Sequence, residues 1–193
     1  MEIKTVAISQ KLVMSAFVIM ADFTFAFAAE PLEFPSRKSG YWHIKMVTEQ
    51  PPGAPPVEVQ ACIDAATDKD MMRAGLSMTK DMCSKNEMSR QGDAIIINAT
   101  CQFGPMTTTS KAVMTGDFQS SYMVKVTGEV DGMPAIAGGG DGPMKTEMTQ
   151  RATWMGDACP GGMKPGDMKM PGGITVNTNE MLKGLGGVLN DKK

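Results

Sequence analysis

The chain has 193 residues, a formal net charge of −2, and a composition that is 42% hydrophobic and 21% charged. This apolar content excludes an intrinsically disordered chain, and the length fits one domain with room for a short tail. Because 19 basic residues are balanced by 21 acidic ones, the charge gives no sign of nucleic-acid binding. The 21 glycines and 12 prolines predict many turns and few long helices.

Residues 1–28 have the pattern of a secretory signal peptide, in which two lysines precede an apolar stretch. The small residues Ala26 and Ala28 predict cleavage after Ala28. The alternative is a membrane anchor, but Asp22 divides the apolar stretch, and neither half reaches the ~20 residues that cross a bilayer. We therefore expect a soluble protein exported to the periplasm, with no membrane span after cleavage.

Hydrophobic and polar residues alternate after a linker at residues 29–39, which is typical of strands with one buried face. In the first predicted strand, 40–49, this alternation puts Trp42, Ile44 and Met46 on one face. The opposite face of that strand is polar and carries the chain's single histidine.

A second short strand is predicted at 57–61, and a helix follows at 67–74. Thr67 is the predicted N-cap of this helix, with Asp70 at its third position, and Gly75 is predicted to end it.

The next predicted element is a β-hairpin with strands at 82–90 and 93–103 and a turn centred on Gly92. Residues at equal distances from Gly92 then face each other, which places Cys83 opposite Cys101. Directly opposed residues have Cα atoms about 4.5–5.5 Å apart, a separation that a disulfide can bridge.

The chain has four cysteines, and an even number in an exported protein predicts two disulfides, with three possible pairings. The hairpin favours Cys83–Cys101, which leaves Cys62 to pair with Cys159. The alternative is a metal or redox role for the thiols, but no two of them have Cys-x-x-Cys spacing, and His43 is far from them in sequence.

Three further strands are predicted at 106–115, 118–130 and 143–155, separated by a turn at Gly116-Asp117 and a Gly-rich loop at 131–142. About seven strands and one short helix indicate a mainly β fold. We expect a single curved antiparallel sheet or a small up-and-down barrel, whose concave face wraps the helix or holds a ligand. A two-sheet sandwich is the alternative.

The predicted disulfide-stapled β domain spans 40–173. Its last part, 157–173, is an extended Pro-Gly segment that Cys159 holds in place. We expect residues 174–193 to form a mobile or weakly helical tail, because several glycines interrupt the amphipathic pattern at 179–189.

Several short motifs occur along the chain in a set order and spacing. They are Gly40-x-Trp42, then Cys62, Cys83 and Cys101, then Gly116-Asp117-Phe118 with Tyr122, and finally Gly156-Asp157-Ala158-Cys159-Pro160 and Gly162-Met163-Lys164-Pro165-Gly166-Asp167. Together they resemble a family of exported Gram-negative bacterial proteins known only as a domain of unknown function. The resemblance covers about residues 38–173 and implies export and the four-cysteine framework, but no activity.

We predict no catalytic residues and no cofactor. His43 lies on the polar face of a predicted strand without a partner that would make it a general base. Several aspartates adjoin glycines, which is typical of turns, and their spacing does not fit a calcium loop. These aspartates are Asp117, Asp131, Asp141, Asp157 and Asp167.

The 20 methionines are the most unusual feature of the composition. Most fit core packing, since Met46, Met144 and Met148 fall at core-like strand positions. Three others, Met163, Met168 and Met170, lie in a polar Pro-Gly-Lys loop. Because thioethers are ligands that select Cu(I), these three form a speculative copper site.

The sequence favours an exported, non-catalytic binding protein, whose partner is a small hydrophobic ligand on the concave sheet or another envelope protein. One alternative is soft-metal binding through the Met-rich loop. Another is an enzyme that works through carboxylates alone, which would need two acids facing each other about 5–10 Å apart across a cleft.

Overall fold

A computed structural model of the chain describes residues 33–133 and 142–190. They belong to one compact unit, Leu32–Lys193. The predicted signal peptide, its cleavage site at Ala28 and most of the Gly-rich loop lie outside the described residues.

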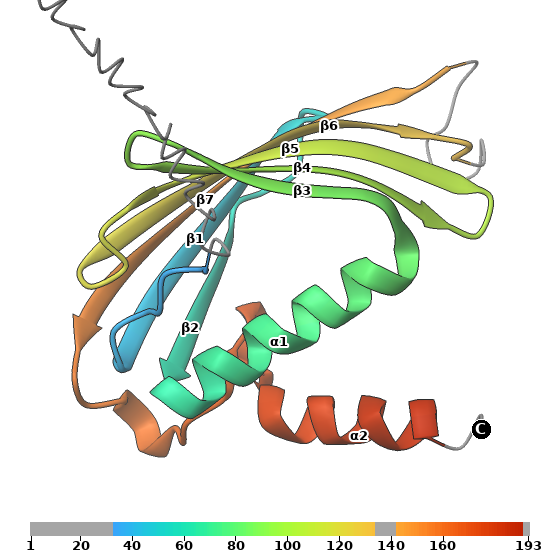
Figure 1. Cartoon of the computed structure of the whole chain (residues 1–193). Coiled ribbons are helices and arrows are strands. Elements are labelled where there is room, and N and C mark those ends of the chain that lie inside the picture. Colours follow the sequence, from blue (N-terminus) through green and yellow to red (C-terminus); the bar gives the residue numbers. More distant parts are fainter. Residues whose placement is uncertain (1–32, 134–141, 191–193) are drawn as a thin grey trace, which may run out of the picture. The chain divides into compact units, whose positions relative to one another are not determined.

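The described residues contain nine β-strands and two α-helices, with two short 3-10 turns near the C-terminus (Figure 1). In chain order the elements are β1 (Gly40–Gln50), β2 (Val57–Ile63), α1 (Ala65–Met82), β3 (Cys83–Gln91), β4 (Ala94–Phe103), β5 (Met106–Gly116), β6 (Ser121–Asp131), β7 (Met144–Gly156), η2 (Pro160–Gly162), β8 (Asp167–Lys169), η3 (Pro171–Gly173), β9 (Thr175–Asn177) and α2 (Thr178–Asn190).

All the described strands pair antiparallel in one sheet, in the order β3-β4-β5-β6-β7-β1-β2-β8-β9. Because β3 and β9 stand at opposite ends of this order and do not pair with each other, the described sheet is not closed. The prediction of a single curved antiparallel sheet is therefore confirmed, and the barrel and sandwich alternatives are wrong. The sheet also continues past residue 173, since β9 pairs with β8 and β8 pairs with β2.

The sheet curves over α1 (Figure 1). Its inner face is apolar where Met114 and Val124 line a hollow together with Met71 and Met72 of α1. The core gathers where β1, β2, β6 and β7 meet, around Trp42, which is fully buried, and Ile44 and Ala152. Register places one apolar row on this inner face across four neighbouring strands, formed by Ile97, Ala112, Val126 and Met148. Alternation along strands thus divides the sheet as the sequence predicts.

The Gly40-x-Trp42 motif has a steric cause at the start of β1. Gly40 has a φ of +127°, a backbone conformation that favours glycine. A Cβ atom there would overlap the carbonyl oxygen of Gly156 and would lie 2.8 Å from the indole nitrogen of Trp154. Glycine therefore lets β1 and the end of β7 approach closely while Trp42 enters the core.

Helix α1 is longer than predicted and begins earlier. Asp64 is its N-cap, and its carboxylate accepts a hydrogen bond from the backbone nitrogen of Thr67 at 2.7 Å. The prediction of Thr67 as N-cap was wrong, because Thr67 is buried inside the first turn. There its hydroxyl accepts a hydrogen bond from the Asn179 side chain of α2, at 3.2 Å.

The hairpin of β3 and β4 differs from the prediction in its turn. The turn is Gly92-Asp93, so most opposed pairs are shifted by one residue from those expected, as with Gln91 and Ala94. One extra residue at Ser84 forms a bulge that shifts the register back, and Cys83 then lies opposite Cys101.

Two disulfides join the four cysteines, Cys83–Cys101 and Cys62–Cys159, and this is the pairing that the sequence predicts. The first lies within the hairpin. The second links the end of β2 to the turn after β7 across 97 residues of sequence.

We expect the Cys62–Cys159 bond to stabilise the fold more than the Cys83–Cys101 bond. In the chain-entropy account, a loop of about a hundred residues gives about 4–5 kcal/mol and one of under twenty about 3 kcal/mol. Urea denaturation of the two double Cys→Ala variants measures this difference. A larger loss of free energy of unfolding for the hairpin variant would contradict the expectation.

Candidate ligand-binding site

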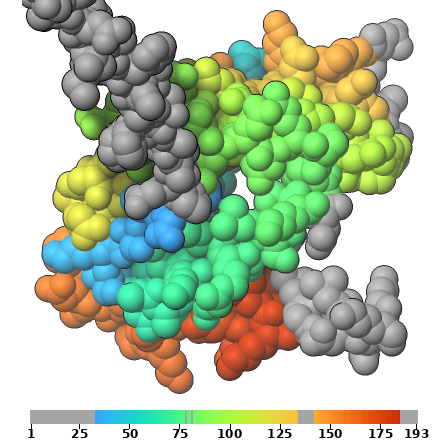
Figure 2. Space-filling model, in the orientation of Figure 1, coloured from blue at the N-terminus to red at the C-terminus, as the bar shows by residue number. Residues whose placement is uncertain are grey.

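A cavity of about 240 Å³ lies between α1, the segment before β1, and the inner face of the sheet. In the space-filling view (Figure 2), the blue residues at the start of the described chain lie beside the green residues of α1. Its apolar lining comes from the segment, the helix and the sheet, through Phe34, Met71, Met72, Met114, Phe118 and Val124. Its polar lining includes Arg37, Asp68, Tyr122 and Gln150.

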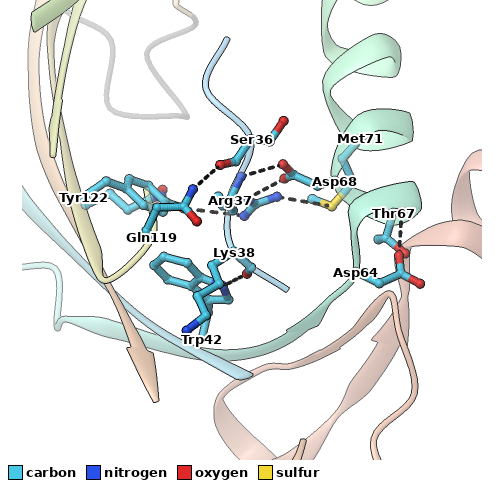
Figure 3. Close-up of polar contacts among 11 residues, drawn as sticks. Ser36, Arg37, Lys38, Trp42, Asp64, Thr67, Asp68, Met71, Gln119 and Tyr122 are labelled. Atoms are coloured by element: carbon cyan, nitrogen blue, oxygen red, sulfur yellow. Dashed lines mark hydrogen bonds and ion pairs between the residues drawn. The ribbon is translucent and has the colours of Figure 1, made fainter. Parts of the chain in front are cut away.

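An ion pair between Arg37 and Asp68 stands at the wall of this cavity (Figure 3). The Arg37 Nε donates to Asp68 Oδ1 at 2.6 Å, and the backbone nitrogen of Arg37 donates to Oδ2 at 2.8 Å. The two side chains are only 15% and 4% exposed. Since a buried charge is stable only when it is paired and hydrogen-bonded, this contact binds α1 to the segment before β1.

Tyr122 of β6 forms the opposite side of the polar end of the cavity. Its ring stacks on Phe118, with centroids 4.9 Å apart, and meets Trp42 at 5.5 Å. Its hydroxyl oxygen accepts from Gln150 Nε2 at 3.3 Å and from Arg37 Nη1 at 3.5 Å. At this end of the cavity, packed aromatic rings therefore lie next to a group of hydrogen-bond donors.

The segment before β1, predicted as part of a linker, is bonded to the domain through residues 36–38. Lys38 donates its backbone N–H to Phe118 O at 2.9 Å and accepts from the Trp42 indole at 2.7 Å. Its ammonium lies 3.5 Å from the ring centroid of Trp154. Gln119 Nε2 donates to Ser36 O at 3.0 Å. Because these contacts hold the segment in place, it can form one wall of the cavity.

A tight turn between β5 and β6 places Phe118 in the core. The strand predicted from residue 118 begins instead at Ser121, and Phe118 has a positive φ of 58°. The Asp117 carboxylate accepts from the Ser120 hydroxyl at 2.6 Å and from three backbone N–H groups. These hydrogen bonds, that of the Ser120 hydroxyl above all, hold the pKa of Asp117 well below its usual 3.8. Asp117 is thus the turn residue that the sequence predicts.

The three methionines of the speculative copper site have different surroundings. Met168, in β8, and Met170 pack against the main core cluster, whereas Met163 follows the η2 turn. Two of the three thioethers therefore contribute to core packing. Among the described residues, no group of three or more His, Cys, Asp or Glu side chains could hold a metal ion.

His43 and the acidic residues of the outer face contact polar or charged neighbours. His43 Nε2 lies 3.5 Å from a Glu58 carboxylate oxygen. Lys125 Nζ lies 2.6 Å from Glu147 Oε1, and this hydrogen bond lowers the pKa of Glu147 and raises that of Lys125. Glu147 is therefore held ionised, which is opposite to what a general acid needs.

Three larger hollows lie elsewhere among the described residues. One, of about 660 Å³, lies between α1 and α2, and its lining combines apolar side chains with Asp64, Asp70, Arg73 and Lys183. A second, of about 530 Å³, lies over strands β3 to β7 and is lined mainly by lysine, threonine and glutamate residues. A third, also of about 530 Å³, lies beside Cys83 and Cys101. The 240 Å³ cavity differs from these in that its lining includes the Arg37–Asp68 ion pair.

The chain belongs to the DUF3617 family, described as a protein of unknown function, whose model matches residues 37–159. The resemblance seen in the motifs is thereby confirmed. No curated protein and no solved structure matches the chain. No helix among the described residues is long and apolar enough to cross a membrane. The match begins at Arg37 and ends at Cys159, so it includes the ion pair and both disulfides.

Sequence reasoning missed Arg37, Asp68, Met71 and Gln150 as members of one site. A signal for Asp68 existed, because it falls with Met71 on one side of the predicted helix, where a charge needs a partner. No local pattern points to Arg37, which is 31 residues away in the chain.

Breaking the buried ion pair should cost far more stability than breaking an exposed pair on the same helix. We expect Asp68→Asn to lower the free energy of unfolding by about 3 kcal/mol, since it leaves the buried Arg37 charge without its carboxylate. The matched control is Asp70→Asn, which breaks the exposed Arg73–Asp70 pair and should cost under about 1 kcal/mol. Urea denaturation of both variants tests this, and equal losses would contradict a structural role for the pair.

Proposed function

We propose that this protein is exported to the periplasm and binds a small apolar molecule in the cavity between α1 and the sheet. In this proposal it acts as a binding protein rather than an enzyme. The observation that carries the proposal is the 240 Å³ cavity, whose lining is largely apolar and includes three methionines, Met71, Met72 and Met114.

The composition of the cavity lining supports an apolar ligand. Methionine side chains are unbranched and polarisable, so they adapt to ligands of irregular shape. The row of Ile97, Ala112, Val126 and Met148 is half-buried and continues the apolar face on the strands that carry Met114 and Val124. A ligand chain would therefore meet apolar surface along several strands.

Export is supported by the cysteines and by the pattern of residues 1–28. Two disulfides and no remaining free cysteine among the described residues fit an oxidising compartment. The basic start, apolar stretch and small residues before position 29 fit a cleaved signal peptide.

The other functions have less support from the geometry. Copper binding would have to take Met168 and Met170 out of core contacts. A carboxylate-based enzyme would need a protonated acid, whereas Glu147 is held ionised by Lys125. If the cavity takes up no ligand, the alternative is that the protein binds another envelope protein.

Protein released gently from the periplasm should begin at Ala29, contain both disulfides and bind a neutral apolar probe. N-terminal sequencing and the intact mass test export, and titration with the fluorescent probe N-phenyl-1-naphthylamine tests the cavity. We expect Val124→Phe, which fills the cavity, to weaken probe binding at least tenfold. Thr109→Phe, at an exposed position of β5, should leave it unchanged.

Two results would contradict the proposal. One is a mature chain that retains residues 1–28. The other is probe binding that Val124→Phe and Thr109→Phe reduce equally, which would place the probe elsewhere on the surface.

A further inference from the structure

The polar end of the cavity has more hydrogen-bond donors than acceptors. Three donors meet there, the Arg37 guanidinium, the Tyr122 hydroxyl and the Gln150 amide. Asp68 is the one carboxylate in the described lining, and both of its oxygens already accept bonds from Arg37. Some of these hydrogen-bond donors therefore remain available to a ligand on the side that faces the cavity.

The Arg37 guanidinium uses its Nε for Asp68 and keeps its two outer nitrogens for weaker contacts. Nη1 lies 3.5 Å from the Tyr122 oxygen, and Nη2 lies 3.8 Å from the Met71 sulfur. The first distance exceeds the 2.7–3.2 Å typical of a good N–H···O bond, and the thioether sulfur in the second contact is only a weak acceptor. The two outer guanidinium nitrogens therefore have no strong acceptor. They form a planar pair of donors whose geometry matches the two oxygens of a carboxylate.

The Tyr122 hydroxyl adds a third donor beside the fork. Its oxygen accepts from Gln150 and Arg37, so both contacts point hydrogens at the oxygen and leave its own proton to be donated. No described residue accepts that proton at hydrogen-bond distance. A ligand oxygen between Arg37 and Tyr122 would receive bonds from both.

We propose that the ligand is an alkyl carboxylate of medium chain length, bound with its carboxylate between Arg37 and Tyr122. Its chain packs among Met71, Met72, Met114 and Val124. This inference rests on the proposed binding function and names the chemical class of its ligand.

The size of the cavity supports a single chain. Pockets for drug-sized ligands have volumes of roughly 300–1,000 Å³. At about 240 Å³, this cavity is smaller and fits one unbranched chain better than a sterol or a two-chain lipid.

Calorimetric titration of the oxidised full-length mature protein with three ligands of equal chain length tests the headgroup. The ligands are decanoate, decanol and decylamine, each below the concentration at which it forms micelles. We expect decanoate to bind at least tenfold more tightly than decanol, because hydrogen bonds to a charged group are stronger than those to a neutral one. Decylamine should bind most weakly, since its ammonium would face the Arg37 charge.

Tyr122→Phe removes the hydroxyl and keeps the ring that stacks on Phe118. We expect it to weaken decanoate binding about tenfold and to change decanol binding by less than twofold. Tyr41→Phe is the matched control, because Tyr41 is the other tyrosine of the chain and is not part of the cavity lining.

The outcomes separate this inference from the proposed function. If the neutral probe binds but decanoate is no tighter than decanol, or Tyr122→Phe and Tyr41→Phe behave alike, the carboxylate inference is overturned and the apolar cavity stands. If neither the probe nor any of the three ligands binds, both proposals fail. Should Tyr122→Phe not fold, the headgroup series on the unaltered protein still decides.

Discussion

The ion pair between Arg37 and Asp68 holds together parts of the chain that no strand pairing connects. It joins the segment before β1 to α1 at a place where both side chains are almost fully buried. A charge that loses its partner there would bear the full cost of its desolvation, so this contact contributes strongly to holding the segment against the helix. The cavity lies where this contact brings the helix beside the aromatic cluster around Tyr122.

Much of the fold could be predicted from the sequence, because strand alternation is a local property. The pattern around Trp42 and Ile44 predicts which face of β1 is buried, and a hairpin turn near Gly92 predicts that Cys83 pairs with Cys101. In the structure the two cysteines lie opposite each other only because of the bulge at Ser84. The bulge at Ser84 could not be predicted, since it compensates a one-residue shift in the turn that both strands must share. Strands β8 and β9 were also missed, because three-residue strands have too few positions to display alternation.

The site was harder to predict, because its parts are distant in sequence and meet only after folding. The inner apolar face follows from alternation, and a ligand on a concave sheet was an expectation from the sequence. The partnership of Arg37 with Asp68 was not, since one residue lies in a segment predicted as a linker. Phe118 shows the same limit, because a buried aromatic in a turn with positive φ contradicts the strand that its neighbours indicate.

Methionine methyl NMR would test the central claim, that the space between α1 and the sheet holds the ligand, most directly. Protein labelled with [methyl-13C]methionine would be titrated with decanoate. We predict that the methyl signals of Met71, Met72 and Met114 shift together and saturate, whereas those of Met155 and Met181, which are 56% and 51% exposed, stay in place. Shifts confined to the exposed methionines, or none at any methionine, would contradict the account.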